Sequence, residues 1–410
     1  MPACRQPHQD GRVREPYSVL SISMAFEQLN KRRPLAPGGE EGMGVNLIGP
    51  IEFVNGLGTS TRGYHAGILE AGIPCNVVPW RIGFEYLSRL DISFSQTGPY
   101  KVNLVHLNLD FLSLGILRSF HLSKLVDSSS YNICIPYWEL SSTLPEWHAT
   151  IRHFDEIWCA SSFVSRAFDA VSSLPISVVR PSLTFSSRAS ARGREGFGLP
   201  GDAFVFLFVM DAGGIWGRKN PEAFINAYLD EFSEEEGALC VLKVGNVQLV
   251  RPQMDGLIES AAGRKDVIFM DELLNEGDMS ALYNSIDCYV SPHRSEGLGL
   301  TILEAMAARK PVIATPYGGV ADFVTESTAY PIDYRFAEVG PGNPPYPPGY
   351  VWAEPEIASI RRQMRHVFSN RPEAGDKGSE AARHARRLFS VESTAAAIHA
   401  RLNEIWEARG

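Results

Sequence analysis

Two adjacent basic residues, Arg218 and Lys219, stand immediately before a predicted helix. Asn220 suits the N-cap of that helix and Pro221 suits its first position, so the helix should begin here. The unpaired N–H groups and the dipole at a helix N-terminus attract anions, and two neighbouring cations strengthen that attraction. The segment therefore predicts a diphosphate-binding site, although two solvated surface cations would give the same residues.

A second segment that could do chemistry, residues 295–307, contains two glycines and two carboxylates. Gly297 and Gly299 let the backbone approach a ligand closely and present N–H donors to it. Glu296 and Glu304 lie eight residues apart. A carboxylate can accept hydrogen bonds from two hydroxyls of a sugar ring, so the pair could hold two sugars of one ligand.

Each of these carboxylates also has a purely structural interpretation. Thr301 and Glu304 have the spacing of a capping box, in which the glutamate only satisfies a backbone N–H group. Glu296 would be an ordinary residue of a solvated loop. The spacing of the two glutamates is therefore a weak signal, and the sequence around them carries more weight.

Short apolar runs alternate with amphipathic stretches from residue 45 onward, and this alternation predicts the scaffold of the site. Parallel strands covered by helices on both faces produce such a pattern. The predicted strands are 45–48, 75–78, 102–105, 132–136, 156–159 and 176–179, then 204–209, 239–244, 267–269, 288–290 and 311–314. The main predicted helices are 60–71, 163–171, 221–231, 279–285, 301–308 and 390–406.

A segment rich in Ser, Arg and Gly, residues 184–200, interrupts the alternation and predicts a hinge between two doubly wound α/β domains. We predict an extension over 1–43 with a short helix at 18–29, domains over 44–190 and 191–380, and a C-terminal helix over 381–410. That helix should cross back to the first domain. Ligands of open α/β sheets bind at the carboxyl ends of the strands, so the site should lie in a cleft between the domains.

Composition excludes several classes of protein. A chain of 410 residues with 44% hydrophobic residues suits two or three globular domains, and a net charge of −9 argues against general nucleic-acid binding. The sequence has no apolar run of the roughly 18 residues that span a bilayer and no secretory signal. Its six scattered cysteines form no C-x-x-C pair, as expected of a reduced, cytoplasmic protein without a zinc site. Peripheral attachment to the inner face of a membrane stays compatible with this composition.

The run of residues 293–324 resembles the donor-binding signature of the retaining glycosyltransferases with two Rossmann-like domains facing each other, the GT-B fold. This group 1 family includes bacterial mannosyl- and rhamnosyltransferases and is similar to bacterial glycogen synthases. The resemblance extends to residues 135–139, 155–162, 216–228, 278–292 and 350–355. It is much more specific in the C-terminal half.

The resemblance implies a role for each residue of the two segments. Glu304 should contact the ribose hydroxyls of the nucleotide, and Glu296 those of the transferred sugar. Lys219, helped by Arg218, should neutralise the diphosphate. Gly58 corresponds to a Gly-rich loop of the relatives, although a tight strand-to-helix turn explains it equally well. The sugar and the diphosphate should contact the backbone N–H groups of Gly297, Leu298, Gly299, Leu300 and Thr301.

The N-terminal half departs from the family at the end of its third predicted strand. Many relatives have a His near the reacting centre where this chain has Asn108, and His106 lies on the same face two residues earlier. Asn108 can hold a sugar hydroxyl but cannot act as a base. Asn108, Glu296 and Lys219 are the candidate catalytic residues. The sequence leaves open whether His106 or Glu139 takes part.

The resemblance implies a hexosyltransferase of polysaccharide biosynthesis. It would transfer a sugar from a nucleotide-sugar donor to a glycan or lipid-linked acceptor, with retention of configuration and without a metal or other cofactor. GDP-, UDP- and dTDP-linked donors all remain open. The alternatives are a nucleotide-sugar epimerase or hydrolase on the same fold, and a catalytically degenerate glycan-binding subunit. A dinucleotide-binding oxidoreductase fits poorly, because Thr61 stands where its fingerprint needs a third glycine or alanine.

Overall fold

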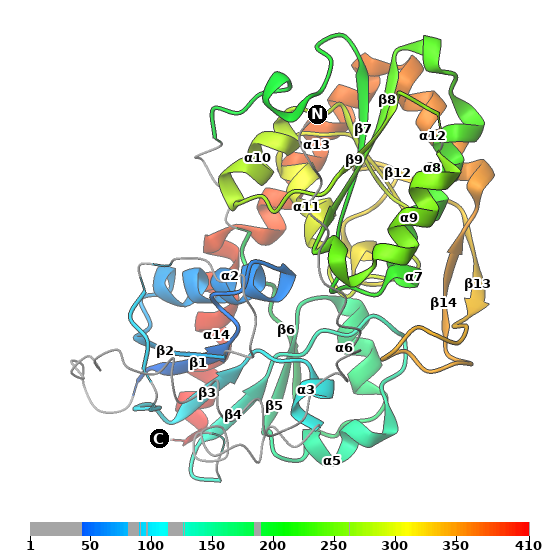
Figure 1. Ribbon diagram of the computed structural model, residues 1–410. Helices are drawn as coiled ribbons and strands as arrows, with labels where there is room; N and C mark the ends of the chain where they lie inside the picture. Colours follow the sequence, from blue (N-terminus) through cyan, green and yellow to red (C-terminus); the bar gives the residue numbers. More distant parts are fainter. Residues whose placement is uncertain are drawn as a thin grey trace, which may run out of the picture.

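The computed structural model describes residues 43–80, 90, 92–95, 97–113, 126, 128–183, 190–261 and 263–409. These residues form two α/β units, one above the other in Figure 1, each with a parallel sheet between helices. The predicted helix at 18–29, nearly all of the predicted extension and residues 184–189 of the predicted hinge lie outside the described residues.

The N-terminal sheet has six parallel strands in the order β2-β1-β3-β4-β5-β6. The strands are β1 Val45–Gly49, β2 Cys75–Pro79, β3 Val102–Val105, β4 Tyr131–Cys134, β5 Glu156–Cys159 and β6 Ile176–Val178. Its α-helices are α2 Gly56–Glu70, α3 Leu109–Ser113, α5 His148–Ile151 and α6 Ser162–Asp169. Most of these strands are buried along their length, which is why their apolar runs were recognisable in the sequence.

The C-terminal sheet also has six parallel strands, in the order β12-β11-β10-β7-β8-β9. They are β7 Phe204–Asp211, β8 Ala238–Gly245, β9 Val267–Met270, β10 Cys288–Ser291, β11 Val312–Ala314 and β12 Tyr330–Pro331. The helices are α7 Trp216–Lys219, α8 Pro221–Glu231, α9 Arg251–Ser260, α10 Glu276–Asn284, α11 Leu300–Ala307, α12 Ile357–Ser369 and α13 Arg371–Phe389. The eleven predicted strands are all present, with ends displaced by at most two residues, so the predicted α/β class is confirmed.

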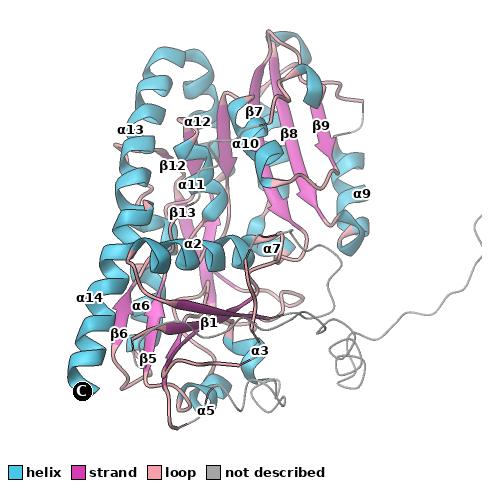
Figure 2. Cartoon of the chain, turned by 90° about the vertical axis from the view of Figure 1, so that its left-hand side faces the viewer, coloured by secondary structure: helices cyan, strands magenta, loops and turns pink. Residues whose placement is uncertain are grey.

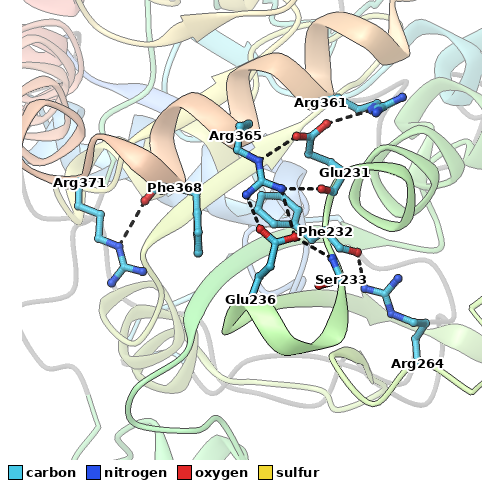
Figure 3. Close-up of polar contacts among 9 residues, drawn as sticks. All are labelled: Glu231, Phe232, Ser233, Glu236, Arg264, Arg361, Arg365, Phe368 and Arg371. Atoms are coloured by element: carbon cyan, nitrogen blue, oxygen red, sulfur yellow. Dashed lines mark hydrogen bonds and ion pairs between the residues drawn. The ribbon is translucent and has the colours of Figure 1, made fainter.

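An arginine of α12 holds the end of α8, the helix that begins just after Lys219. Arg365 lies 2.9 Å from a carboxylate oxygen of Glu231 and 2.5 Å from one of Glu236, and its guanidinium lies over the ring of Phe232 (Figure 3). These contacts combine charge-assisted hydrogen bonds with cation–π contact. The position of α8, and with it the start of that helix, is thus fixed by a helix more than a hundred residues later in the chain.

An antiparallel hairpin extends from the C-terminal unit to the N-terminal one, seen at the right of Figure 1. Its strands are β13 Tyr334–Glu338 and β14 Val351–Pro355, and the Pro-rich segment 340–350 joins them. Tyr346 of that loop packs on Trp138 of the N-terminal unit, and its hydroxyl donates to Glu139 Oε2 at 2.8 Å. The hairpin therefore ties the two units together.

The last helix, α14 Val391–Arg409, crosses back to the N-terminal unit, as predicted. Figure 2 shows α13 beside the C-terminal sheet and α14 beside the N-terminal one. Ile398 and Leu402 enter the N-terminal core, and Arg401 binds the fully buried Glu156 at 2.7 and 2.8 Å. Among the helices of the described residues, none combines the length and apolar character needed to cross a bilayer.

Candidate functional site

The predicted diphosphate residues and the first predicted glutamate meet in one buried ion cluster. Lys219 Nζ lies 2.5 Å from Glu296 Oε1, and Arg218 Nη1 lies 3.0 Å from Glu296 Oε2. Arg218 is 6% exposed and Glu296 is 7% exposed. The Lys219 side chain is 15% exposed, so neither cation is a solvated surface residue. Two cations facing one carboxylate leave the cluster with one net positive charge, which suits an anionic ligand.

The cluster forms because two loops of neighbouring strands, β7 and β10, lie against each other. The short helix α7 ends at Lys219, and its C-cap Asn220, with a φ of 59°, turns the chain so that α8 can begin at Pro221. The sequence suggested that the Asn220 side chain caps α8, but it does not. It donates instead to the Pro292 carbonyl at 3.1 Å. The Arg294 N–H donates to the Arg218 carbonyl at 2.8 Å. These bonds hold the basic loop beside the acidic one.

The charges in the cluster are set by burial and by one another. Burial alone would raise the pKa of Glu296, but Arg218 and Lys219 outweigh that effect and lower the pKa to about 2. The carboxylate is therefore ionised at neutral pH. His293 is fully buried beside it, and desolvation lowers its pKa to about 3, so the imidazole is neutral.

The glycine loop after Glu296 is shaped by contact with the N-terminal unit. A Cβ on Gly297 would lie 2.9 Å from the Trp138 carbonyl oxygen, and Ser161 Oγ donates to the Gly297 carbonyl at 2.7 Å. Gly299 has a φ of 86°, which favours glycine, and acts as the N-cap of α11. The first N–H groups of α11, which begins at Leu300, have no partner within the helix and can bind an anion.

Glu304 lies half-buried on α11 and does not serve as part of a capping box. The helix is capped at Gly299, no side chain accepts a hydrogen bond at its N-terminus, and Thr301 is already inside it. The Tyr283 hydroxyl donates to Glu304 Oε2 at 2.9 Å. Desolvation raises the pKa of Glu304 to about 7 because no cation pairs with this carboxylate as closely as Lys219 does with Glu296.

The start of α2 faces the start of α11 across the two units. A Cβ on Gly56 would lie 3.5 Å from Leu300 Cδ1. The helix begins at Gly56, four residues before the predicted start, because the Asn55 side chain accepts from the Gly58 N–H at 3.0 Å. A Cβ on Gly58 would lie 2.0 Å from the Phe53 carbonyl oxygen. Gly58 is thus required by a tight turn, and its own N–H is already bonded.

Helix α2 of the N-terminal unit also carries Arg62. Its guanidinium forms an ion pair of 2.8 Å with Glu276 of α10 and lies close enough to Glu304 to act on the pKa of that carboxylate. The N-terminal unit therefore contributes a cation next to the second predicted glutamate. Sequence reasoning missed this residue, because nothing in the local pattern of α2 indicates which helix of the other unit it faces.

His106 and Asn108 hold the N-terminal side of the site together. His106 Nε2 and the Tyr137 hydroxyl each lie 2.7 Å from Ser60 Oγ, and desolvation lowers the pKa of the buried His106 to about 3. These contacts favour the structural interpretation of His106. Asn108 Oδ1 accepts from the Tyr137 N–H at 3.0 Å, and Tyr137 in turn lies against the Gly297 loop.

Two carboxylates, Asp110 and Glu139, lie on the N-terminal side of the site, and the sequence had left the role of Glu139 open but had not singled out Asp110. Burial, with a smaller contribution from the nearby Glu139, raises the pKa of Asp110 to about 6. Glu139 also accepts from Tyr346 and, through its carbonyl oxygen, from the Ser295 hydroxyl. The only signal in the sequence was the place of Asp110 in the first turn of a helix after a strand.

The segment that carries these residues matches a known protein family. Residues 204–337, which include Lys219, Glu296 and Glu304, match the family described as glycosyl transferases group 1. A lipopolysaccharide core biosynthesis mannosyltransferase, LpcC from Rhizobium leguminosarum bv. viciae, is 27% identical over 221 residues, 53% of this chain and 55% of that protein. A D-inositol 3-phosphate glycosyltransferase from Streptomyces coelicolor is 29% identical over 220 residues, 52% of this chain and 42% of the relative. The chain thus spans about half the length of these curated relatives.

Solved structures show the same architecture. Anabaena Alr3699/HepE in complex with UDP and glucose superposes with a TM-score of 0.63 at 14% identity, covering 88% of this chain and 100% of that one. Sucrose-phosphate synthase from Thermosynechococcus elongatus gives a TM-score of 0.66 at 14% identity, covering 90% and 100%. The fold is therefore GT-B. Within it, residues 204–337 are the part of the chain that matches the group 1 glycosyltransferase family.

The ion cluster predicts how stability depends on pH. The folded pKa of Glu296 is about 2, below the ordinary value of 4.5, so its stabilising effect is present above pH 4.5 and is lost as the pH falls towards 2. Glu296→Gln should lower the free energy of unfolding by on the order of 3 kcal/mol at pH 7 and by almost nothing near pH 2. Urea unfolding across this pH range measures the difference. Glu235→Gln, at an exposed carboxylate, is the matched control, and a difference independent of pH would contradict the assignment.

Proposed function

We propose that the protein is a glycosyltransferase that moves a hexosyl group from a nucleotide-sugar to a glycan or lipid-linked acceptor. The transfer retains the anomeric configuration and uses no metal or other cofactor. The observation that carries this proposal is the buried cluster of Arg218, Lys219 and Glu296 beside the N-terminus of α11, inside a group 1 glycosyltransferase domain. Its net positive charge and free N–H groups suit a sugar diphosphate.

The chemistry follows from where charge develops. When the sugar leaves the nucleotide, negative charge gathers on the diphosphate, and the ammonium of Lys219, the guanidinium of Arg218 and the N-terminus of α11 stabilise it. These groups are already fixed by their bonds to Glu296 and Ser295, so little reorganisation is needed during the reaction. The carboxylate of Glu296 has lone pairs left to accept hydrogen bonds from hydroxyls of the bound sugar.

The nature of the substrates is supported by the relatives. The HepE complexes contain UDP, glucose or UDP-glucose, and LpcC is a mannosyltransferase of lipopolysaccharide core biosynthesis. For this chain we accordingly propose a UDP-, GDP- or dTDP-linked hexose as donor and a glycan of polysaccharide biosynthesis as acceptor. Retention rests on the resemblance of residues 293–324 to retaining enzymes. A lipid-linked acceptor would bring this cytoplasmic enzyme to the inner face of the membrane.

Release of nucleoside diphosphate tests the proposal. The purified full chain is incubated with UDP-, GDP- and dTDP-hexoses, with and without glycan or lipid-linked acceptors, in the presence of either Mg²⁺ or EDTA. We expect release from one nucleotide class that depends on acceptor and is equal in EDTA. Release accompanied only by free sugar would indicate a hydrolase, formation of an epimer would indicate an epimerase, and loss of turnover in EDTA would refute metal independence.

Lys219 should matter more for turnover than for binding. Lys219→Met removes a charge that faces the leaving diphosphate, so kcat should fall by a factor on the order of 100 while KM for the donor changes much less. Steady-state kinetics with the donor found above measures both constants. Lys265→Met, at an exposed lysine of the same unit, should leave them unchanged. A near-normal kcat in Lys219→Met would show that the diphosphate lies elsewhere.

Glu304 should give donor binding a distinctive pH dependence. Its pKa is raised to about 7, and only the ionised carboxylate can accept hydrogen bonds from both ribose hydroxyls. The affinity for the nucleoside diphosphate should therefore rise by up to about tenfold between pH 6 and pH 8. Calorimetry measures the affinity of the same ligand for wild type and for Glu304→Gln. The effect of phosphate titration on affinity is the same for both proteins and cancels in the comparison. Equal pH profiles for the two proteins would remove Glu304 from the ribose.

A further inference from the structure

Strand β8 carries a buried lysine that the proposed mechanism does not use. Lys243 is only 7% exposed. Its amine forms neither a hydrogen bond nor an ion pair with any residue in the part of the chain that the structure describes. Buried lysines are rare unless they are paired, because transferring an ammonium group out of water is costly. An explanation for this one is therefore needed.

The amine points to the edge of the sheet where the other site residues lie. Leu239 and Val241 share the face of Lys243 and pack into the core formed with α10 and α11, whereas Cys240 and Leu242 face the opposite core. Lys243 Nζ lies 3.4 Å from where a Cβ on Gly245 would be. Because Gly245 is the last residue of β8, the side chain runs towards the carboxyl end of the strand.

The surrounding carboxylates do not account for the amine. Asp211, on the neighbouring strand β7, lies near enough to influence it but is already bonded to the Asn246 side chain at 2.7 Å and to the Gly213 N–H at 2.7 Å. Asp271, Glu272 and Glu304 also act electrostatically on Lys243, but Glu272 is paired with Arg192 and Glu304 accepts from Tyr283. Burial is the largest influence on the pKa of Lys243 and lowers it. The amine is thus held close to acidic groups without being paired to them.

The order of strands separates Lys243 from the diphosphate cations. Lys219 and Glu296 follow β7 and β10, and β8 lies on the other side of β7 from β10. Suppose that the sugar of the ligand contacts Glu296 and its diphosphate lies at the start of α11. The nucleoside would then extend past Glu304 towards β8. The amine of Lys243 would then meet hydrogen-bond acceptors of that nucleoside.

We infer that Lys243 binds the nucleoside part of the donor, donating hydrogen bonds to ribose or base atoms beside Glu304. The inference rests on the proposed function, because it needs a nucleotide donor. It accounts for a lysine whose side chain is largely buried and whose amine has no partner within the described residues: the partner arrives with the substrate. A residue of this kind lowers the stability of the free protein and raises its affinity for ligand.

Lys243→Met tests the inference, because methionine fills similar space without the charge. Calorimetry measures the affinity of the full chain for the nucleoside diphosphate that wild type binds best, for the matching monophosphate and for inorganic pyrophosphate. We expect the two nucleotides to bind at least about tenfold more weakly to the variant and pyrophosphate to bind equally. The thermal midpoint of the unliganded variant should be equal to or above that of wild type. Lys265→Met, at an exposed lysine, should change none of these quantities.

Each other outcome separates the inference from the proposed function. Nucleotide affinities within twofold of wild type would overturn the role of Lys243. Weaker binding of the diphosphate but not of the monophosphate would place the amine on the phosphate and overturn the nucleoside assignment. Weaker binding together with a lower midpoint of the unliganded variant would assign the amine to the fold instead. A wild-type protein that binds no nucleotide would refute the proposed function itself.

Discussion

The paired charges of Glu296, Lys219 and Arg218 join the two loops on which the candidate site depends. One loop follows β7 and the other follows β10, and these strands are neighbours in the C-terminal sheet. A buried charge that loses its partner is strongly destabilising, so each loop needs the other in place. The cluster is therefore both a structural link within the domain and a fixed source of positive charge at the start of α11.

The same loops are also held from the other unit. The Gly297 loop lies against Trp138 and Ser161, and the Ser295 hydroxyl donates to the Glu139 carbonyl oxygen. Glycine is needed at 297 because the backbone of the other unit approaches so closely. The contact between the units thus constrains the shape of the site, and it brings Glu139 of the N-terminal unit close enough to act on the charge of Arg218.

Glu296, in the loop before α11, and Glu304, within α11, have opposite protonation behaviour because their surroundings differ. Glu296 is buried and Glu304 is half-buried, and desolvation by itself favours the neutral acid in both. Glu296 has two cations in contact and stays ionised, whereas Glu304 has a tyrosine hydroxyl and more distant cations and titrates near neutrality. The neutral His293 beside Glu296 adds no charge to the site. Electrostatic compensation, rather than burial, distinguishes the two carboxylates.

The sequence by itself determined the strands, the start of α8 and the segment around Glu296. The apolar runs of buried strands, helix initiation and glycine turns depend on residues that are adjacent in the sequence. It did not determine partners. Lys219 and Glu296 are separated by 77 residues, and only the pairing of β7 with β10 brings them together. The hydrogen bond of Gly58 to Asn55, the burial of His106 and the isolation of Lys243 likewise depend on packing. Tertiary structure decided these features, since what a buried polar group contacts is set by elements distant in the chain.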